Sequence, residues 1–144
     1  MINNFINDVC EILNISVPIA SFDTSSFQSK TTMAQVNRSG DTIYIKNYDN
    51  HDPDLFFSIA HELRHVWQIR TNEKLYLSEY KPVDSCGSIE EYNLQIAEID
   101  ANAFAAMVMV DFFRITPLFN GMPDSVKDMI HERMEFINDT EFSN

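Results

Sequence analysis

Two histidines four residues apart carry the strongest chemical signal in this sequence. They belong to the segment His61-Glu62-Leu63-Arg64-His65. On an α-helix, positions i and i+4 lie on one face, so both imidazoles can bind the same metal ion. Glu62 lies next to that face, where its carboxylate can act as a base toward a water molecule. The segment therefore predicts a hydrolytic metal site.

A third ligand must come from elsewhere in the chain, because a catalytic zinc site has three protein ligands and one open position. Glu98 is the best candidate, since it lies on a later predicted helix among several alanines. A carboxylate buried in such a segment needs a partner, and a metal ion is a suitable one. The other candidates are the side chains of His51, His131, Cys10 and Cys86.

Two further polar residues follow Glu98 on the same predicted helix. Asn102 comes four residues later and shares the face of Glu98, so its amide can hydrogen-bond a ligand histidine. An ordinary polar helix residue is an equally good interpretation of Asn102. Asp100 points away from that face, and we expect it to be an exposed helix charge.

The two motifs resemble those of the ImmA/IrrE-type zinc metallopeptidases, small bacterial and phage enzymes with a zincin fold. The likeness covers about residues 33–110 and rests on the histidine motif and on Glu98-x-x-Ala101-Asn102-x-Phe104-Ala105. The resemblance implies that His61, His65 and Glu98 bind Zn²⁺ and that Glu62 is the general base. It also implies a protein substrate, such as a helix-turn-helix repressor of a phage or mobile element.

Peptide hydrolysis also needs a group that stabilises the oxyanion and a surface that holds the peptide. For the first role the sequence offers Tyr76, Tyr80, Arg64 and His131 without choosing among them. For the second, the strand expected over 42–46 leads toward the motif helix. We expect the edge of this strand to bind the peptide as an added strand.

The elements that must position these residues follow from hydrophobic spacing and turn signals. Asp52 and Pro53 are suited to begin a helix, and Ser88 and Glu91 stand at capping-box spacing. The expected elements are a short helix at 2–13, a hairpin at 32–46, the motif helix at 53–70, a third-ligand helix at 88–113 and a C-terminal helix at 124–137. Together they predict one α+β, zincin-like domain over 1–144, with an antiparallel sheet packed on the two ligand-bearing helices.

Composition excludes several classes of function. The 144 residues include 22 acidic and 10 basic side chains, a net charge of −12. Such a chain repels nucleic acid and anionic membranes, so neither is expected as a direct partner. No apolar run approaches the roughly 20 residues of a membrane-spanning helix. The first residues lack the features of a secretory signal, and two cysteines make no disulfide framework, so we expect a cytoplasmic protein.

The leading hypothesis is therefore a zinc endopeptidase with a specific protein substrate. The alternative is a non-catalytic binding module of the same fold that sequesters a protein partner. A third hypothesis is metal-dependent hydrolysis of a non-peptide amide. Zn²⁺ is the expected ion, although manganese, cobalt or iron also suit two histidines and a carboxylate.

Overall fold

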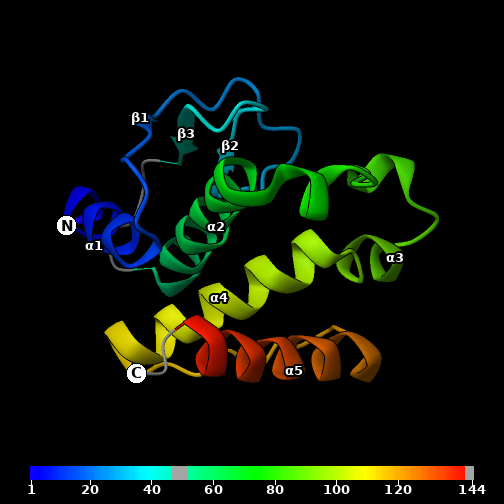
Figure 1. Ribbon diagram of the computed structural model, residues 1–144. Coiled ribbons are helices and arrows are strands. Elements are labelled where there is room, and N and C mark those ends of the chain that lie inside the picture. Colours follow the sequence, from blue (N-terminus) through cyan, green and yellow to red (C-terminus); the bar gives the residue numbers. More distant parts are fainter. Residues whose placement is uncertain (47–51, 142–144) are drawn as a thin grey trace.

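The computed structural model describes residues 1–46 and 52–141. Figure 1 shows a small sheet above the long helix α2, with α4 crossing below α2 and α5 below α4, while α1 packs beside α2. The elements are α1 (Ile2–Leu13), β1 (Ile19–Ser21), β2 (Ala34–Val36), β3 (Thr42–Ile45), α2 (Pro53–Leu77), the 3-10 helix η1 (Val83–Ser85), α3 (Ile89–Asn93), α4 (Ile96–Phe113) and α5 (Asp124–Glu141). The α+β class expected from the sequence is confirmed.

The sheet has the strand order β1-β3-β2 and is mixed. β2 pairs with β3 in antiparallel fashion, as the predicted hairpin requires, and Gly40 gives its turn a φ of 75°. β1 pairs with β3 in parallel, so the prediction of an antiparallel sheet is wrong. The segment between β1 and β2 passes from one side of β3 to the other, so β1 and β2 lie on opposite sides of β3. β1 runs parallel to β3. A strand of three residues is too short for its spacing to reveal this pairing.

Helix α2 begins where the sequence predicted and ends later. The Asp52 side chain accepts a hydrogen bond from the Asp54 backbone, and Pro53 takes the first helical position. The helix continues to Leu77 instead of residue 70, through a non-helical Asn72 with φ −158° and ψ 67°. The residues that bear the histidine motif precede this break, so the motif lies in regular helix.

The predicted helix at 88–113 consists of two helices, α3 and α4. Ser88 caps α3 by accepting a hydrogen bond from the Glu91 backbone, as its spacing indicated. Leu94 and Gln95 then separate α3 from α4, and Gln95 has extended backbone angles. α4 is buried along almost its whole length because it packs between α2 and α5. Its alanines allow this close approach on two sides.

The core is made by the inner faces of α1, α2, α4 and α5 and by the sheet. Four phenylalanines, Phe5, Phe56, Phe112 and Phe113, pack their rings together where α1, α2 and α4 meet. α5 extends to Glu141, beyond the predicted end at residue 137. Within the two described ranges, no helix is long and apolar enough to cross a bilayer.

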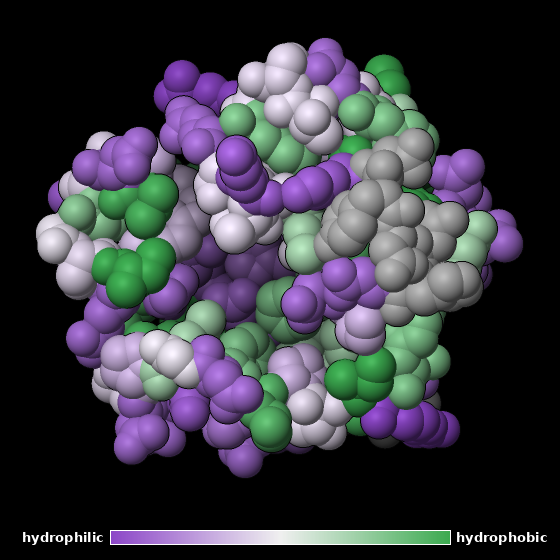
Figure 2. Space-filling view, turned by 180° about the vertical axis from the view of Figure 1, so that it is seen from behind, coloured by the Kyte–Doolittle hydropathy of each residue, from purple (hydrophilic) through white to green (hydrophobic). Residues whose placement is uncertain are grey.

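The surface opposite the view of Figure 1 is hollowed near its centre (Figure 2). The floor of the hollow is hydrophilic, whereas hydrophobic residues border its lower edge and lie scattered over the rest of this face.

Candidate metal centre

Two crossing helices bring three potential metal ligands together. His61 and His65 project from α2, and Glu98 lies in the first turn of α4. His61 Nε2 is 3.3 Å from Glu98 Oε1, and His65 Nε2 is 3.0 Å from Glu98 Oε2. One ligand atom from each residue lies within 4.8 Å of the others. The group can therefore hold a metal ion, as its spacing in the sequence predicted.

The other candidates for the third ligand do not join this group. Cys10 is buried in the core on α1, and Cys86 lies between η1 and α3. His131 is exposed on α5. His51 falls outside the described residues. Among the described residues, Glu98 is the carboxylate that completes the set.

Amide side chains fix the orientation of both imidazoles. His61 Nδ1 is 2.8 Å from Asn102 Oδ1, and His65 Nδ1 is 2.8 Å from Gln68 Oε1. An amide oxygen only accepts hydrogen bonds, so each Nδ1 is the donor and each Nε2 faces Glu98. The two Nε2 atoms are 3.1 Å apart. This arrangement fits a metal ion, because two imidazole nitrogens and a carboxylate oxygen form a ligand set that Zn²⁺ takes in catalytic sites.

Asn102 thus makes the hydrogen bond to a histidine that its spacing allows, whereas the hydrogen bond of Gln68 to His65 was not predicted. The spacing did indicate that Gln68 can reach His65, since a residue three positions later lies on the same helix face. Gln68 Nε2 also donates to Asp100 Oδ2 over 2.9 Å and to the Ala97 carbonyl over 3.0 Å. The amide therefore links the ligand histidine to the helix that carries the ligand carboxylate.

The expectation that Asp100 is exposed is wrong. Its side chain is fully buried and accepts hydrogen bonds from Arg64, Gln68 and Arg133. The physical reason is that Asp100 lies where three helices meet, since Arg64 and Gln68 reach it from α2 and Arg133 reaches it from α5. Arg64 is equally buried and also pairs with Glu141 on α5.

Glu62 lies beside the ligand group without being part of it. Its side chain is 16% exposed, and its Oε2 is 3.8 Å from His65 Nε2. The backbone of Val36 on β2 lies near its carboxylate and favours the ionised form. Burial raises the pKa of Glu62 above its usual value, against the opposing effect of His65 and His61. A carboxylate with a raised pKa is better suited to exchange a proton near neutral pH.

Glu98 and His65 stabilise each other's charge. Burial disfavours the ionised form of both, but the two histidines outweigh it and hold the pKa of Glu98 well below its usual range. In the same way, Glu98 overcomes the burial of His65 and raises the pKa of that imidazole to about 9. The carboxylate is therefore ionised and attracts a cation, which is a proton on His65 in the absence of a metal ion.

Of the four oxyanion candidates, Tyr80 is the one that reaches the site. Its hydroxyl donates to Glu98 Oε2 over 3.1 Å. Tyr76 instead accepts a hydrogen bond from Arg133, and Arg64 is held in the buried network described above. His131 lies exposed on α5. Burial and the negative charge of Glu98 raise the pKa of Tyr80, so its phenol remains a donor.

The strand next to the site is β2, and not the strand at 42–46. β3 lies between β1 and β2, so both of its edges are occupied and the expectation of a free edge there is wrong. On either side of β2, the Met33 carbonyl accepts a hydrogen bond from the N–H of Lys46, just after β3, and the Asn37 N–H donates to the Thr42 carbonyl. In an antiparallel pair such bonds alternate along the strand. The backbone of Val36 therefore faces away from β3, toward Glu62.

No protein-family model, curated protein or solved structure matches this chain. The functional conclusion therefore rests on the residues of the site.

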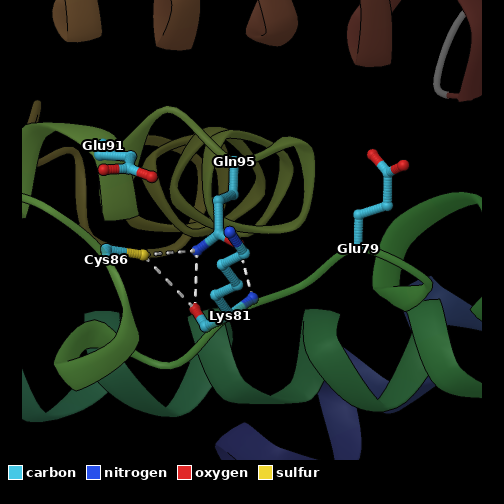
Figure 3. A pocket seen from close by; sticks show the side chains of 5 residues that line it. All are labelled: Glu79, Lys81, Cys86, Glu91 and Gln95. Carbon is cyan, nitrogen blue, oxygen red and sulfur yellow. Dashed lines mark hydrogen bonds between the residues drawn. The ribbon is translucent and has the colours of Figure 1, made fainter.

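A cavity of about 440 Å³ lies beside the loop that carries Tyr80. It is lined by Glu79, Lys81, Cys86, Glu91 and Gln95. In Figure 3 the side chain of Gln95 extends toward Lys81 and Cys86, while Glu79 and Glu91 lie at opposite sides of the view. Gln95 accepts a hydrogen bond from the Lys81 backbone N–H and donates one to its carbonyl. No pattern in the sequence indicates this contact, because the segment before residue 88 has only the features of a connector.

Proposed function

We propose that this protein is a zinc-dependent endopeptidase. His61, His65 and Glu98 hold the ion, and Glu62 is the general base. The observation that carries the proposal is the meeting of three ligand atoms within 4.8 Å, with the Glu62 carboxylate 3.8 Å from one of them. Few kinds of site other than those of metal-dependent hydrolases combine two histidines, a ligand carboxylate and a separate carboxylate base in this spacing.

The residues around the ion have distinct tasks. A divalent ion held by these ligands acidifies a water molecule and polarises a substrate carbonyl. Glu62 accepts a proton from the attacking water and delivers it to the amine that leaves. Asn102 and Gln68 keep the two imidazoles oriented toward the ion.

A peptide substrate is supported by the position of β2. Its outward edge lies next to Glu62, and an extended peptide can align with such an edge through main-chain hydrogen bonds. The resemblance to the ImmA/IrrE-type metallopeptidases adds that the substrate is a specific protein, such as a helix-turn-helix repressor of a phage or mobile element. The net charge of −12 suits this class of substrate, because DNA-binding proteins are basic.

The proposal is tested by comparing wild-type protein with the variant Glu62→Gln, both loaded with Zn²⁺. We expect equal zinc content by elemental analysis, because Glu62 is not a ligand. The rate of cleavage is measured by mass spectrometry on a proteome-derived peptide library. We expect this rate to be about 10² to 10⁴-fold lower in Glu62→Gln than in wild type. The matched control is Glu132→Gln, which changes an exposed glutamate of α5 and should cleave like wild type.

Two results would contradict the proposal. Equal turnover by Glu62→Gln would show that another group is the base. A zinc-loaded wild-type protein that cleaves neither the library nor basic repressor proteins would favour the binding module.

A further inference from the structure

A pair of phenols lies on the carboxylate that we propose as a metal ligand. Tyr80 Oη donates to Glu98 Oε2 over 3.1 Å, and Tyr92 Oη lies 3.0 Å from Tyr80 Oη. A phenol has one hydrogen to donate, and Tyr80 uses it for Glu98. Tyr92 is therefore the donor in the bond between the phenols. The two rings form a hydrogen-bonded relay that ends on one oxygen of Glu98.

The loop that carries Tyr80 is fixed to the helix that carries Glu98. Gln95, the residue before α4, accepts a hydrogen bond from the Lys81 N–H over 2.7 Å and donates one to the Lys81 carbonyl over 2.9 Å (Figure 3). Its amide thus pairs with the backbone of Lys81 as a neighbouring peptide group would. Since Lys81 directly follows Tyr80, these two bonds set the position of the phenol relative to Glu98.

We infer that Tyr80 is a positioning residue that keeps Glu98 a one-oxygen ligand. The inference rests on the proposed metal site. A carboxylate can bind a metal ion through one oxygen or through both. The hydrogen bond from Tyr80 occupies one lone pair of Oε2 and draws electron density from that oxygen, so Oε2 is a weaker metal ligand than Oε1. With one oxygen engaged, Glu98 supplies a single bond, and the site keeps the open position that catalysis requires.

Loss of the phenol has a defined consequence. Tyr80→Phe keeps the ring and removes the donor, so both oxygens of Glu98 become available to the ion. The carboxylate then fills the open position and raises the coordination number. It also loses a contact that orients it, and such outer contacts typically change metal affinity by about 10 to 100-fold.

The experiment uses cobalt(II) alone as the probe, added to metal-free protein. Four-coordinate cobalt(II) absorbs visible light more strongly than five- or six-coordinate cobalt(II), so the spectrum reports coordination number directly. Affinity is measured in parallel by competition with a chelator, and circular dichroism verifies the fold. The matched control is Tyr44→Phe. Tyr44 lies on β3 between the buried Ile43 and Ile45, so its side chain faces the other side of the sheet from those two residues.

A second variant keeps the test decisive if Tyr80→Phe does not fold. Gln95→Glu retains the acceptor for the Lys81 N–H but cannot donate to the Lys81 carbonyl. It should displace the loop and weaken the hold of Tyr80 on Glu98. We expect weaker visible bands and a loss of affinity of about 10-fold or more in both variants, with Tyr44→Phe like wild type.

The outcomes separate this inference from the proposed function. An unchanged cobalt spectrum in the folded variants overturns the role of Tyr80, whatever the affinity, and leaves the peptidase proposal intact. An equal change in Tyr44→Phe also overturns it. Wild-type protein that binds no cobalt overturns both the inference and the metal site on which it rests.

Discussion

The side chains of Arg64 and Asp100 form an ion pair from which solvent is completely excluded. Arg64 Nε donates to Asp100 Oδ2 over 2.7 Å, and Nη2 donates to Oδ1 over 3.0 Å. Glu141 of α5 binds the same guanidinium, and Arg133 of α5 binds the same carboxylate. The network joins α2, α4 and α5 close to the candidate ligands His65 and Glu98, and it therefore fixes the crossing of the helices that carry them.

Removal of one charge from this network should be costly. Asp100→Asn leaves the Arg64 guanidinium buried with less negative charge beside it, so we expect the free energy of unfolding to fall by about 3 kcal/mol. Urea denaturation followed by circular dichroism measures the change. Asp111→Asn, at an exposed aspartate of the same helix, should stay within about 0.5 kcal/mol of wild type. Equal stability of the two variants would show that the buried pair is replaceable.

The ligand set predicts the metal content of single variants. We expect about one Zn²⁺ per chain in wild type, the ratio of a single site, and little in Glu98→Ala. His131→Ala should retain the wild-type ratio, because its imidazole lies exposed on α5. Elemental analysis after gel filtration measures these ratios. Zinc retained by Glu98→Ala, or lost from folded His131→Ala, would contradict the assignment of the third ligand.

Asn102 should affect the metal without binding it. Asn102→Ala removes the acceptor of His61 Nδ1 and frees the imidazole to rotate, so zinc affinity should fall by about 10 to 100-fold. Competition with a fluorescent zinc indicator measures the affinity. Asn3→Ala, at an exposed position of α1, serves as the control. An unchanged affinity in Asn102→Ala would show that packing alone orients His61.

Cys10 should make the protein sensitive to high pH. Its side chain is 1% exposed, and burial raises the pKa of the thiol from 9.0 to about 11 although Arg70 opposes this. The unfolded chain therefore ionises first, so stability is unaffected below about pH 8 and falls between pH 9 and 11, by at most about 3 kcal/mol. Urea unfolding at pH 8 and pH 10.5 should show a larger loss in wild type than in Cys10→Ala. Cys86→Ala should lose as much as wild type, and a similar loss in Cys10→Ala would assign the effect to other groups.

The sequence was most informative where one local rule decides the outcome. The spacing of His61 and His65 determines that both lie on one helix face, and the structure places their Nε2 atoms 3.1 Å apart. The position of Glu98 was harder to predict, because its distance from the two histidines depends on how α4 crosses α2. The alanines around it indicated a close helix contact, and the chemistry of the motif indicated what the contact was for.

The errors concern residues whose surroundings depend on elements distant in sequence. Asp100 looked exposed because the pattern of α4 could not show that α5 would cover its second side. β1 pairs in parallel through a connection that no turn signal marks. The phenol of Tyr80 reaches Glu98 because Gln95 binds a backbone group, and backbone partners leave no trace in residue spacing.

The burial of Leu63 and Arg64 has a consequence for how this site could be lost. Both side chains are fully buried, so the five residues from His61 to His65 contain no position free of a task. Three of them serve the site, and two hold the helix against its neighbours. A polar or much smaller side chain at either of the latter would misplace the candidate ligands although all of them remain in the sequence, and loss of the site would begin as a folding defect.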